Sequence, residues 1–232
     1  MLKFSIEIII FLIVGMAGGI FATQIIWPNF VEEPILKAIQ NAPIAQHDQT
    51  VAKQNNDLTQ AVKEAEKTIL GVGSVVANKK YLSGSGLVIT NDGLVLSLAN
   101  IISQNPSVFY NEETISAKTL KKDSLSNLSL LKIEKNNLPA CRFAPPEKIK
   151  LGEKVFIMGK KFDGKDFVTF VDDGIIKNFN NNLIETNISE DKFAAGTALF
   201  NIDGEVLGIN YLSSSGRVVA IPAQIIRQFI NF

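Results

Sequence analysis

Hydrophobic and polar residues follow three different patterns along this chain. From Ile8 to Ile26 the residues are uncharged and mostly apolar, over about the length that an α-helix needs to cross a bilayer. From Val72 onward, β-branched runs are separated by turn signals such as Asn91-Asp92-Gly93, which predicts an all-β barrel or sandwich. The apolar residues between Ala223 and Ile230 predict a short helix after the last strand.

The apolar N-terminal run predicts a single-pass transmembrane anchor over residues 1–27. Lys3 precedes the run, so the positive-inside bias places the N-terminus in the cytoplasm. We therefore expect the rest of the chain on the outer side of a bacterial cytoplasmic membrane. A cleaved signal peptide is the alternative, because Ala17-Gly18-Gly19 and Ala22 offer small residues for cleavage. Residues 28–56 combine prolines and amides with few large apolar side chains and are expected to form a stalk.

A short amphipathic helix is expected to lead from the stalk into the β-rich region. Its apolar residues recur at helical spacing: Leu58, Ala61, Val62, Ala65 and Ile69. We expect this face to pack against the β structure. Residues 57–232 are then long enough for one domain with a sizeable core.

Composition and charge argue against several classes of function. The net charge is zero, from 23 basic and 23 acidic residues without a long basic run, so nothing indicates nucleic-acid binding. The single cysteine, Cys141, allows no disulfide within the chain. The single histidine, His47, lies far from Cys141 in the sequence, so we expect no metal site. The sequence contains no convincing glycine-rich phosphate-binding loop, so we expect no cofactor.

Five segments resemble, in the same order, the signatures of trypsin-like serine proteases of the HtrA/Deg kind. They are Gly84–Ile102, Lys122–Ile133, Leu151–Gly159, Lys192–Asn210 and Gly216–Pro222. The resemblance covers roughly Asp57 to Phe232 and implies two six-stranded antiparallel β-barrels, at about residues 68–135 and about residues 150–221. It also implies that the C-terminal helix caps the second barrel and that the PDZ domain of many relatives is absent.

In this resemblance, residues that cannot perform the chemistry occupy the three catalytic positions. Asn100 stands at the position of the histidine, Asn127 at that of the aspartate and Ala195 at that of the serine. Alanine has no oxygen nucleophile, and a carboxamide is not a usable base near neutral pH. The oxyanion loop is degraded as well, because Phe193 and Thr197 replace glycines that shape its backbone. We therefore expect a pseudoprotease.

A relocated nucleophile, which would make the chain an active serine-type peptidase, is the alternative hypothesis. Cys141 has no histidine near it in the sequence, although a catalytic cysteine needs a base or an electropositive setting. Thr197 and Ser189 flank the degenerate site without an identifiable base. Lys192 would suit a Ser-Lys dyad, but its acidic neighbours favour the protonated, solvated amine.

The preferred function is that of a binding or scaffold protein. In proteases of this family the substrate adds as an extended strand, here at Tyr211, Leu212 and Ser213, with a pocket beside Asn187 to Ala195. Main-chain pairing of this kind needs no triad, so a protein or peptide partner is expected. The competing expectation is a groove filled by Phe193 and Phe167, which leaves a scaffold that acts through its outer face. The resemblance also suggests a homo-oligomer, since many relatives form trimers.

Overall fold

The fold is given by a computed structural model. The residues that it describes are 2–22, 24, 47–75, 81–190, 192–213 and 217–230. The chain divides into two units, Met1–Ala52 and Lys53–Phe232.

In the first unit, helix α1 spans Leu2–Phe21. No helix among the described residues is both long enough and apolar enough to cross a membrane. The anchor predicted over residues 1–27 is therefore not confirmed. Residues 25–46, which hold most of the predicted stalk, lie outside the described residues.

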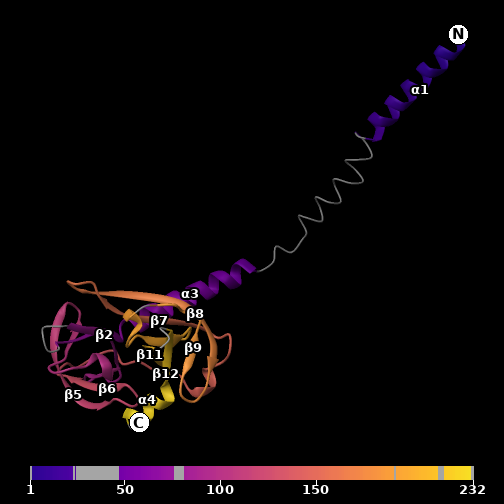
Figure 1. The fold of residues 1–232 in the computed structure, drawn as a ribbon. Helices are drawn as coiled ribbons and strands as arrows, with labels where there is room; N and C mark the ends of the chain where they lie inside the picture. Colours follow the sequence, from indigo (N-terminus) through magenta and orange to yellow (C-terminus); the bar gives the residue numbers. More distant parts are fainter. Residues whose placement is uncertain are drawn as a thin grey trace. The chain divides into compact units, whose positions relative to one another are not determined.

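Six antiparallel strands close into the first barrel, in the spatial order β1-β2-β3-β6-β5-β4 (Figure 1). Their bounds are β1 Ile69–Val75, β2 Tyr81–Val88, β3 Leu94–Leu98, β4 Ser107–Tyr110, β5 Glu113–Asp123 and β6 Leu128–Ile133. The short 3-10 helix η4 spans Ala99–Ile101, directly after β3.

Six further antiparallel strands close into the second barrel, in the order β10-β11-β12-β9-β8-β7. Their bounds are β7 Lys154–Phe162, β8 Phe167–Phe179, β9 Ile184–Thr186, β10 Ala198–Asn201, β11 Val206–Leu212 and β12 Val218–Pro222. Two 3-10 helices flank these strands, η5 at Pro146–Lys148 and η6 at Lys192–Ala194. The prediction of two six-stranded antiparallel barrels is confirmed.

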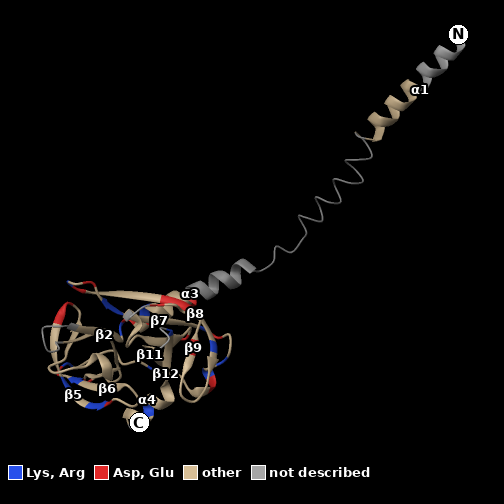
Figure 2. Cartoon of the chain, in the orientation of Figure 1, with Lys and Arg blue, Asp and Glu red and all other residues tan. Residues whose placement is uncertain are grey.

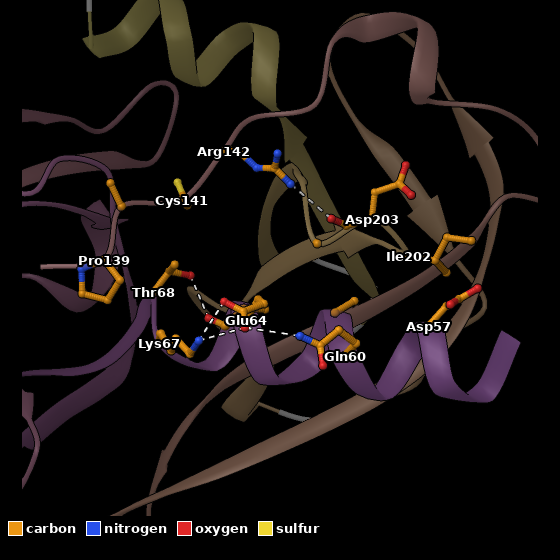
Figure 3. A pocket seen from close by; sticks show the side chains of 14 residues that line it. Asp57, Gln60, Glu64, Lys67, Thr68, Pro139, Cys141, Arg142, Ile202 and Asp203 are labelled. Carbon is orange, nitrogen blue, oxygen red and sulfur yellow. Dashed lines mark hydrogen bonds and ion pairs between the residues drawn. The ribbon is translucent and has the colours of Figure 1, made fainter. Parts of the chain in front are cut away.

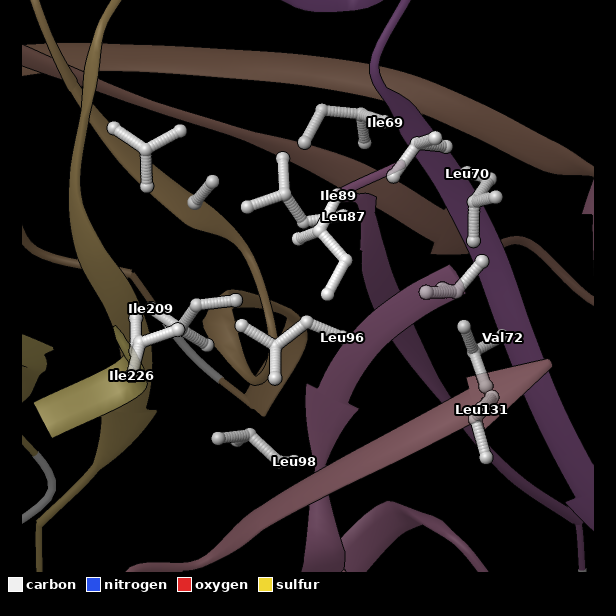
Figure 4. Packing of buried hydrophobic residues seen from close by; sticks show 14 of the residues in the cluster. Ile69, Leu70, Val72, Leu87, Ile89, Leu96, Leu98, Leu131, Ile209 and Ile226 are labelled. Carbon is white, nitrogen blue, oxygen red and sulfur yellow. The ribbon is translucent and has the colours of Figure 1, made fainter. Parts of the chain in front are cut away.

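Buried apolar side chains form one large cluster that spans both barrels and a smaller one inside the second barrel. Strand β7 contributes to both, because successive side chains of a strand point to opposite faces. Phe156 and Met158 lie in the large cluster, whereas Val155 and Ile157 lie in the smaller one. In Figure 4, side chains from the strands of the first barrel meet side chains of β11 and of the C-terminal helix. The core thus joins the two barrels.

Helix α3 spans His47–Glu66 and precedes the first barrel. Four of the predicted apolar residues, Leu58, Ala61, Val62 and Ala65, pack on the large cluster as expected. The fifth, Ile69, fits helical spacing but begins β1, where it pairs with Leu87. The helix also begins earlier than the sequence predicted, because residues 47–56, assigned to the stalk, are helical.

Helix α4 spans Ala223–Ile230, where the sequence predicted it. The resemblance implied that it caps the second barrel, and it also packs on the core shared with the first, because Ile226 and Phe229 are buried in the large cluster. Lys121 of β5 donates to the backbone oxygen of Phe229 at 2.5 Å. Arg227 donates to the backbone oxygen of Phe143, in the segment between the barrels, at 3.0 Å. The helix therefore ties the first barrel and the inter-barrel segment to the second barrel.

The β7–β8 hairpin extends from the second barrel toward the first (Figure 1). At its tip, the ring of Phe167 lies 4.6 Å from that of Phe109 in β4, measured between centroids. A Cβ built on Gly71 of β1 would lie 2.5 Å from the Phe167 ring, so this glycine makes room for the aromatic side chain. Phe167 therefore packs against the first barrel, and the expectation that it helps to fill the groove beside Asn187 is wrong.

Charged residues of both signs are interspersed over the described part of the barrels in the view of Figure 2. Exposed ion pairs lie on both barrels, such as Lys132–Asp92 at 3.1 Å and Lys148–Asp203 at 2.8 Å. Exposed pairs of this kind stabilise a fold by roughly 0–1 kcal/mol each. Burial of the shared core, not surface charge, therefore holds the barrels together.

Candidate functional site

The positions predicted to replace the catalytic histidine and aspartate lie next to each other. Asn100 belongs to η4, and Asn127 lies in the turn that leads from β5 into β6. The side-chain oxygen Oδ1 of Asn127 accepts a hydrogen bond from the backbone N–H of Asn100 at 3.0 Å, across 27 residues of sequence. Its backbone oxygen accepts a second one from Ala99 at 2.9 Å. Asn127 has a φ of 55°, in the left-handed region that asparagine adopts more readily than most residues.

The turn that presents Asn127 is held by Asp123. Its carboxylate accepts hydrogen bonds from the hydroxyl of Ser126 at 2.6 Å and from the backbone N–H of Leu125 at 2.9 Å. Chiefly because of the Ser126 hydroxyl, the pKa of Asp123 lies below its ordinary value of 3.8. The carboxylate is therefore ionised near neutral pH, and its charge-assisted hydrogen bonds fix the turn.

Acidification is expected to weaken this turn. A carboxylate whose pKa is lowered by folding contributes stability above its ordinary value of 3.8, and the contribution is lost as the pH falls through the lower folded-state value. We expect the free energy of unfolding, measured in urea, to fall as the pH is lowered from about 7 to about 3. The Asp123→Asn variant is expected to lose less unfolding free energy over this range than the unmodified chain. Equal losses in the two proteins would show that Asp123 does not contribute.

Ala195, at the predicted position of the serine, follows η6 and contacts β2. A Cβ built on Gly84 would lie 2.6 Å from Cδ1 of Ile101 in η4 and 2.8 Å from the backbone oxygen of Ala195. A side chain at position 84 would therefore displace one of these two segments. The backbone N–H of Ser85 also donates to the Ala195 oxygen at 3.3 Å. The fold thus brings η4 and the Ala195 loop to the same part of β2.

Two N–H groups of the loop around Ala195, those of Gly196 and Thr197, are bonded within the chain. Helix η6 is a 3-10 turn over Lys192–Ala194, and the N–H of Thr197 donates to the backbone oxygen of Ala194 at 3.2 Å. The hydroxyl of Thr197 donates to the backbone oxygen of Ala194 at 2.8 Å and accepts from Nδ2 of Asn210 at 3.0 Å. The N–H of Gly196 donates to the backbone oxygen of Asn210 at 2.9 Å. An oxyanion hole needs N–H groups that converge on one exposed point, and the N–H groups of Gly196 and Thr197 are instead bonded within the chain.

Phe193 lies against β7. The ammonium nitrogen of Lys161 sits 4.0 Å from the centroid of the Phe193 ring, a cation–π contact. The ring is half-buried, and it does not line the pocket that Asn187 to Glu190 help to form. The contact with Lys161 therefore holds the Phe193 ring against β7.

The two barrels meet behind the loop at Ser85, which is fully buried. Its hydroxyl accepts a hydrogen bond from the backbone N–H of Lys160 at 2.8 Å, and its backbone oxygen accepts one from the hydroxyl of Ser97 at 2.8 Å. A Cβ built on Gly159 would lie 2.3 Å from Cγ2 of Thr197 and 2.4 Å from Oγ of Ser85. Sequence reasoning placed Ser85 and Gly159 only within their signatures, because the residues that they contact are distant in the chain.

The alternative nucleophiles are placed unfavourably for chemistry. Cys141 borders a cavity of about 610 Å³ between α3 and the inter-barrel segment (Figure 3). Burial raises the pKa of its thiol to about 12, so the thiol stays protonated near neutral pH. Thr197 is fully buried, and Ser189 is exposed beside the groove. The side chain of Lys192 lies outside the described residues.

One edge of β11 stays unpaired near the predicted peptide site. Tyr211 and Leu212 pair with β12 on one side. On the other side, the pairing with β10 ends at Ile209, and Asn210 bonds to the loop at Thr197. Among the described residues, no strand pairs with that second edge at Tyr211 and Leu212. Alternate residues of a strand direct their N–H and C=O groups to the same side, so Leu212, like Asn210, presents its groups to the open edge.

A pocket of about 250 Å³ adjoins β12, the strand that pairs with Tyr211 and Leu212. It is lined by Lys177, Glu185, Thr186, Asn187, Ile188, Ser189, Glu190, Arg217, Val218 and Val219. Oδ1 of Asn187 accepts a hydrogen bond from the N–H of Ile175 at 2.7 Å, which anchors the pocket wall to β8. The mixed charges suit a polar side chain. Across the described residues, no three His, Cys, Asp or Glu side chains gather to hold a metal ion.

Comparison with known proteins places this geometry in a family. Residues 71–209 match the trypsin-like peptidase domain family. A probable periplasmic serine endoprotease DegP-like from Pseudomonas fulva is 30% identical over 138 residues, which are 55% of this chain and 28% of that protein. Serine protease HTRA1A of Danio rerio is 31% identical over 165 residues, which are 64% of this chain and 34% of that protein. The chain thus spans about a third of the length of these relatives.

The crystal structure of the serine endoprotease from Yersinia pestis is similar to the fold described above. The TM-score is 0.67 at 26% sequence identity, over 75% of this chain and 65% of that chain.

Proposed function

Because the chain belongs to the trypsin-like peptidase domain family, we propose that it is a catalytically inactive member that binds an extended protein or peptide segment along β11. The observation that carries the proposal is the unpaired edge at Tyr211 and Leu212; the neighbouring strand β12 lines a pocket of about 250 Å³. Backbone pairing along such an edge needs neither a nucleophile nor a base. A groove can therefore work where the catalytic positions have been lost.

The absence of catalysis is supported by the chemistry of the residues at the site. A triad mechanism needs a hydroxyl, a base with a pKa near 7 and an acid that orients the base. Ala195, Asn100 and Asn127 supply none of these, and the only histidine of the chain is His47. The high pKa of Cys141 and the buried hydroxyl of Thr197 also weigh against a relocated nucleophile.

The binding mode implies modest affinity and loose sequence preference. Each main-chain hydrogen bond contributes a net of roughly 0.5–1.5 kcal/mol, and only a few fit along Tyr211 and Leu212. A side chain that enters the pocket at Asn187 adds contact and selectivity. Phe193 leaves this pocket open, because its ring faces Lys161. These positions favour the peptide groove over a scaffold that acts only through its outer face.

Binding to an unfolded protein tests the proposal. We expect fluorescein-labelled, unfolded casein to bind the full chain and Leu212→Pro to weaken the binding by about tenfold, because proline removes the N–H at the open edge. The control, Leu212→Ala, keeps the N–H and is expected to bind nearly as well as the unmodified chain. Fluorescence anisotropy gives both affinities. Absent binding, or equal binding by the proline and alanine variants, would contradict the proposal.

We also propose that the domain works outside the cytoplasm, held to the membrane by residues 1–27. Relatives named as periplasmic support an extracytoplasmic location. The apolar run from Ile8 to Ile26 supports the anchor. In spheroplasts, added protease is expected to reach the stalk near His47 and release the barrels, while the full-length chain needs detergent for extraction. A mature N-terminus after Ala22 would show a signal peptide instead. A homo-trimer stays a prediction.

A further inference from the structure

A chain of side-chain hydrogen bonds connects α3 to the β7–β8 hairpin. Nζ of Lys160 in β7 donates to the hydroxyl of Thr169 in β8 at 2.5 Å. That hydroxyl donates in turn to Oε1 of Glu66, the last residue of α3, at 3.0 Å. Lys160 is half-buried, and burial lowers the pKa of its ammonium group while Glu66 opposes the shift. The link therefore runs from the half-buried side chains of Lys160 and Thr169 to the exposed carboxylate of Glu66.

The same two residues of β7 also contact the degenerate catalytic loop. Successive side chains of a strand point to opposite faces, so that Lys160 turns to α3 while Lys161 turns to the Phe193 ring, 4.0 Å away. The backbone N–H of Lys160 donates to the hydroxyl of Ser85 at 2.8 Å. Ser85 in turn donates its own N–H to the backbone oxygen of Ala195 at 3.3 Å. Two routes thus join β7 to the loop.

We propose that the last turn of α3 sets the conformation of the groove loop, residues 193–197, through Lys160 and Lys161. Every step between Glu66 and the loop is a hydrogen bond, a cation–π contact or a peptide bond, which gives a contiguous physical connection. Glu66 is the last residue of α3, so a displacement of the last turn of this helix reaches the network directly. The idea that this connection regulates a peptide groove rests on the proposed function. The mechanical coupling between α3 and the loop does not depend on it.

Hydrogen exchange in the loop measures this coupling without any ligand. Thr169→Val keeps the shape of the side chain but removes the hydroxyl that joins Lys160 to Glu66. In the full chain, we expect the amides of Gly196 and Thr197, which donate to Asn210 and Ala194, to exchange about fivefold faster in this variant. Mass spectrometry of peptides that cover residues 193–197 gives the rates. Thr169→Ser, which retains the hydroxyl, is expected to exchange like the unmodified chain.

Two controls separate coupling from a general loss of stability. Thr119→Val makes the same change on β5, outside the network, and is expected to leave the loop unchanged. The second control is Lys161→Met, which removes the charge over Phe193. In a chain that already carries Lys161→Met, we expect Thr169→Val to raise the loop exchange rate by less than half as much as it does in the unmodified chain. Loop exchange that is equal in Thr169→Val and Thr119→Val, or an undiminished effect in the Lys161→Met chain, would overturn the proposal. Casein binding is not part of this measurement, so its failure would count only against the proposed function.

Discussion

Replacement of Gly196 by alanine is expected to lower the free energy of unfolding by about 2–5 kcal/mol, from backbone strain and overpacking together. Gly196 has a φ of 81°, which residues with a β-carbon adopt only at a cost. An added Cβ would lie 2.5 Å from the backbone oxygen of Ser85. Because this neighbour is main chain, no rotamer change relieves the clash. The loss is a large share of the roughly 5–15 kcal/mol that stabilises a typical domain.

Gly152 supplies the matched control for this prediction. Its φ of 76° is nearly the same, but nothing lies within 4 Å of an added Cβ. Gly152→Ala therefore carries only the backbone strain, about 1–2 kcal/mol. Urea denaturation of the three proteins gives the difference that is due to the close approach between the barrels. If both variants lose the same stability, β2 and the loop are not packed as tightly as described.

Restoration of the three triad residues is expected to leave proteolysis far below that of an active relative. Ala195→Ser alone should produce no turnover, because loss of the histidine alone costs roughly a million-fold in the protease template. The triple variant that adds Asn100→His and Asn127→Asp still carries Phe193 and Thr197 in the loop, where we expect them to impair an oxyanion hole. Loss of a single oxyanion donor costs roughly a hundredfold to a thousandfold in rate.

A five-residue variant tests the contribution of the loop. Addition of Phe193→Gly and Thr197→Gly to the triple variant is expected to raise the initial rate on fluorogenic casein by about a hundredfold. Labelling by a fluorophosphonate probe should rise in parallel, and near-UV circular dichroism verifies that each variant is folded. The relocated nucleophile would instead be favoured if the unmodified chain cleaved casein and if this activity were lost in Cys141→Ala, Ser189→Ala or Thr197→Val.

The architecture could be predicted from sequence because its signals are local. The turn signal at Asn91-Asp92-Gly93 precedes β3, and Gly93 has the φ of 99° that favours glycine. The apolar residues after Pro222 form α4 over Ala223–Ile230 as predicted. In each case the residues that carry the signal are neighbours in the chain. Backbone preferences and side-chain periodicity therefore suffice to place the element.

Predictions failed where distant contacts override local pattern. Ile69 continues the helical spacing, but pairing with Leu87 places it in β1. Phe167 begins β8 of the second barrel, yet it packs on Gly71 of the first.

The sequence by itself determined which chemical groups the site can hold. The chain has one histidine, at His47, and the three aligned positions hold Asn100, Asn127 and Ala195. The identity of these side chains limits the chemistry that the site can perform. Only the tertiary structure decided which groups meet. The hydrogen bond from Asn100 to Asn127 spans 27 residues, and that from Lys160 to Ser85 spans 75. Such contacts depend on the closure and packing of two barrels, whose long-range geometry no local run of residues encodes.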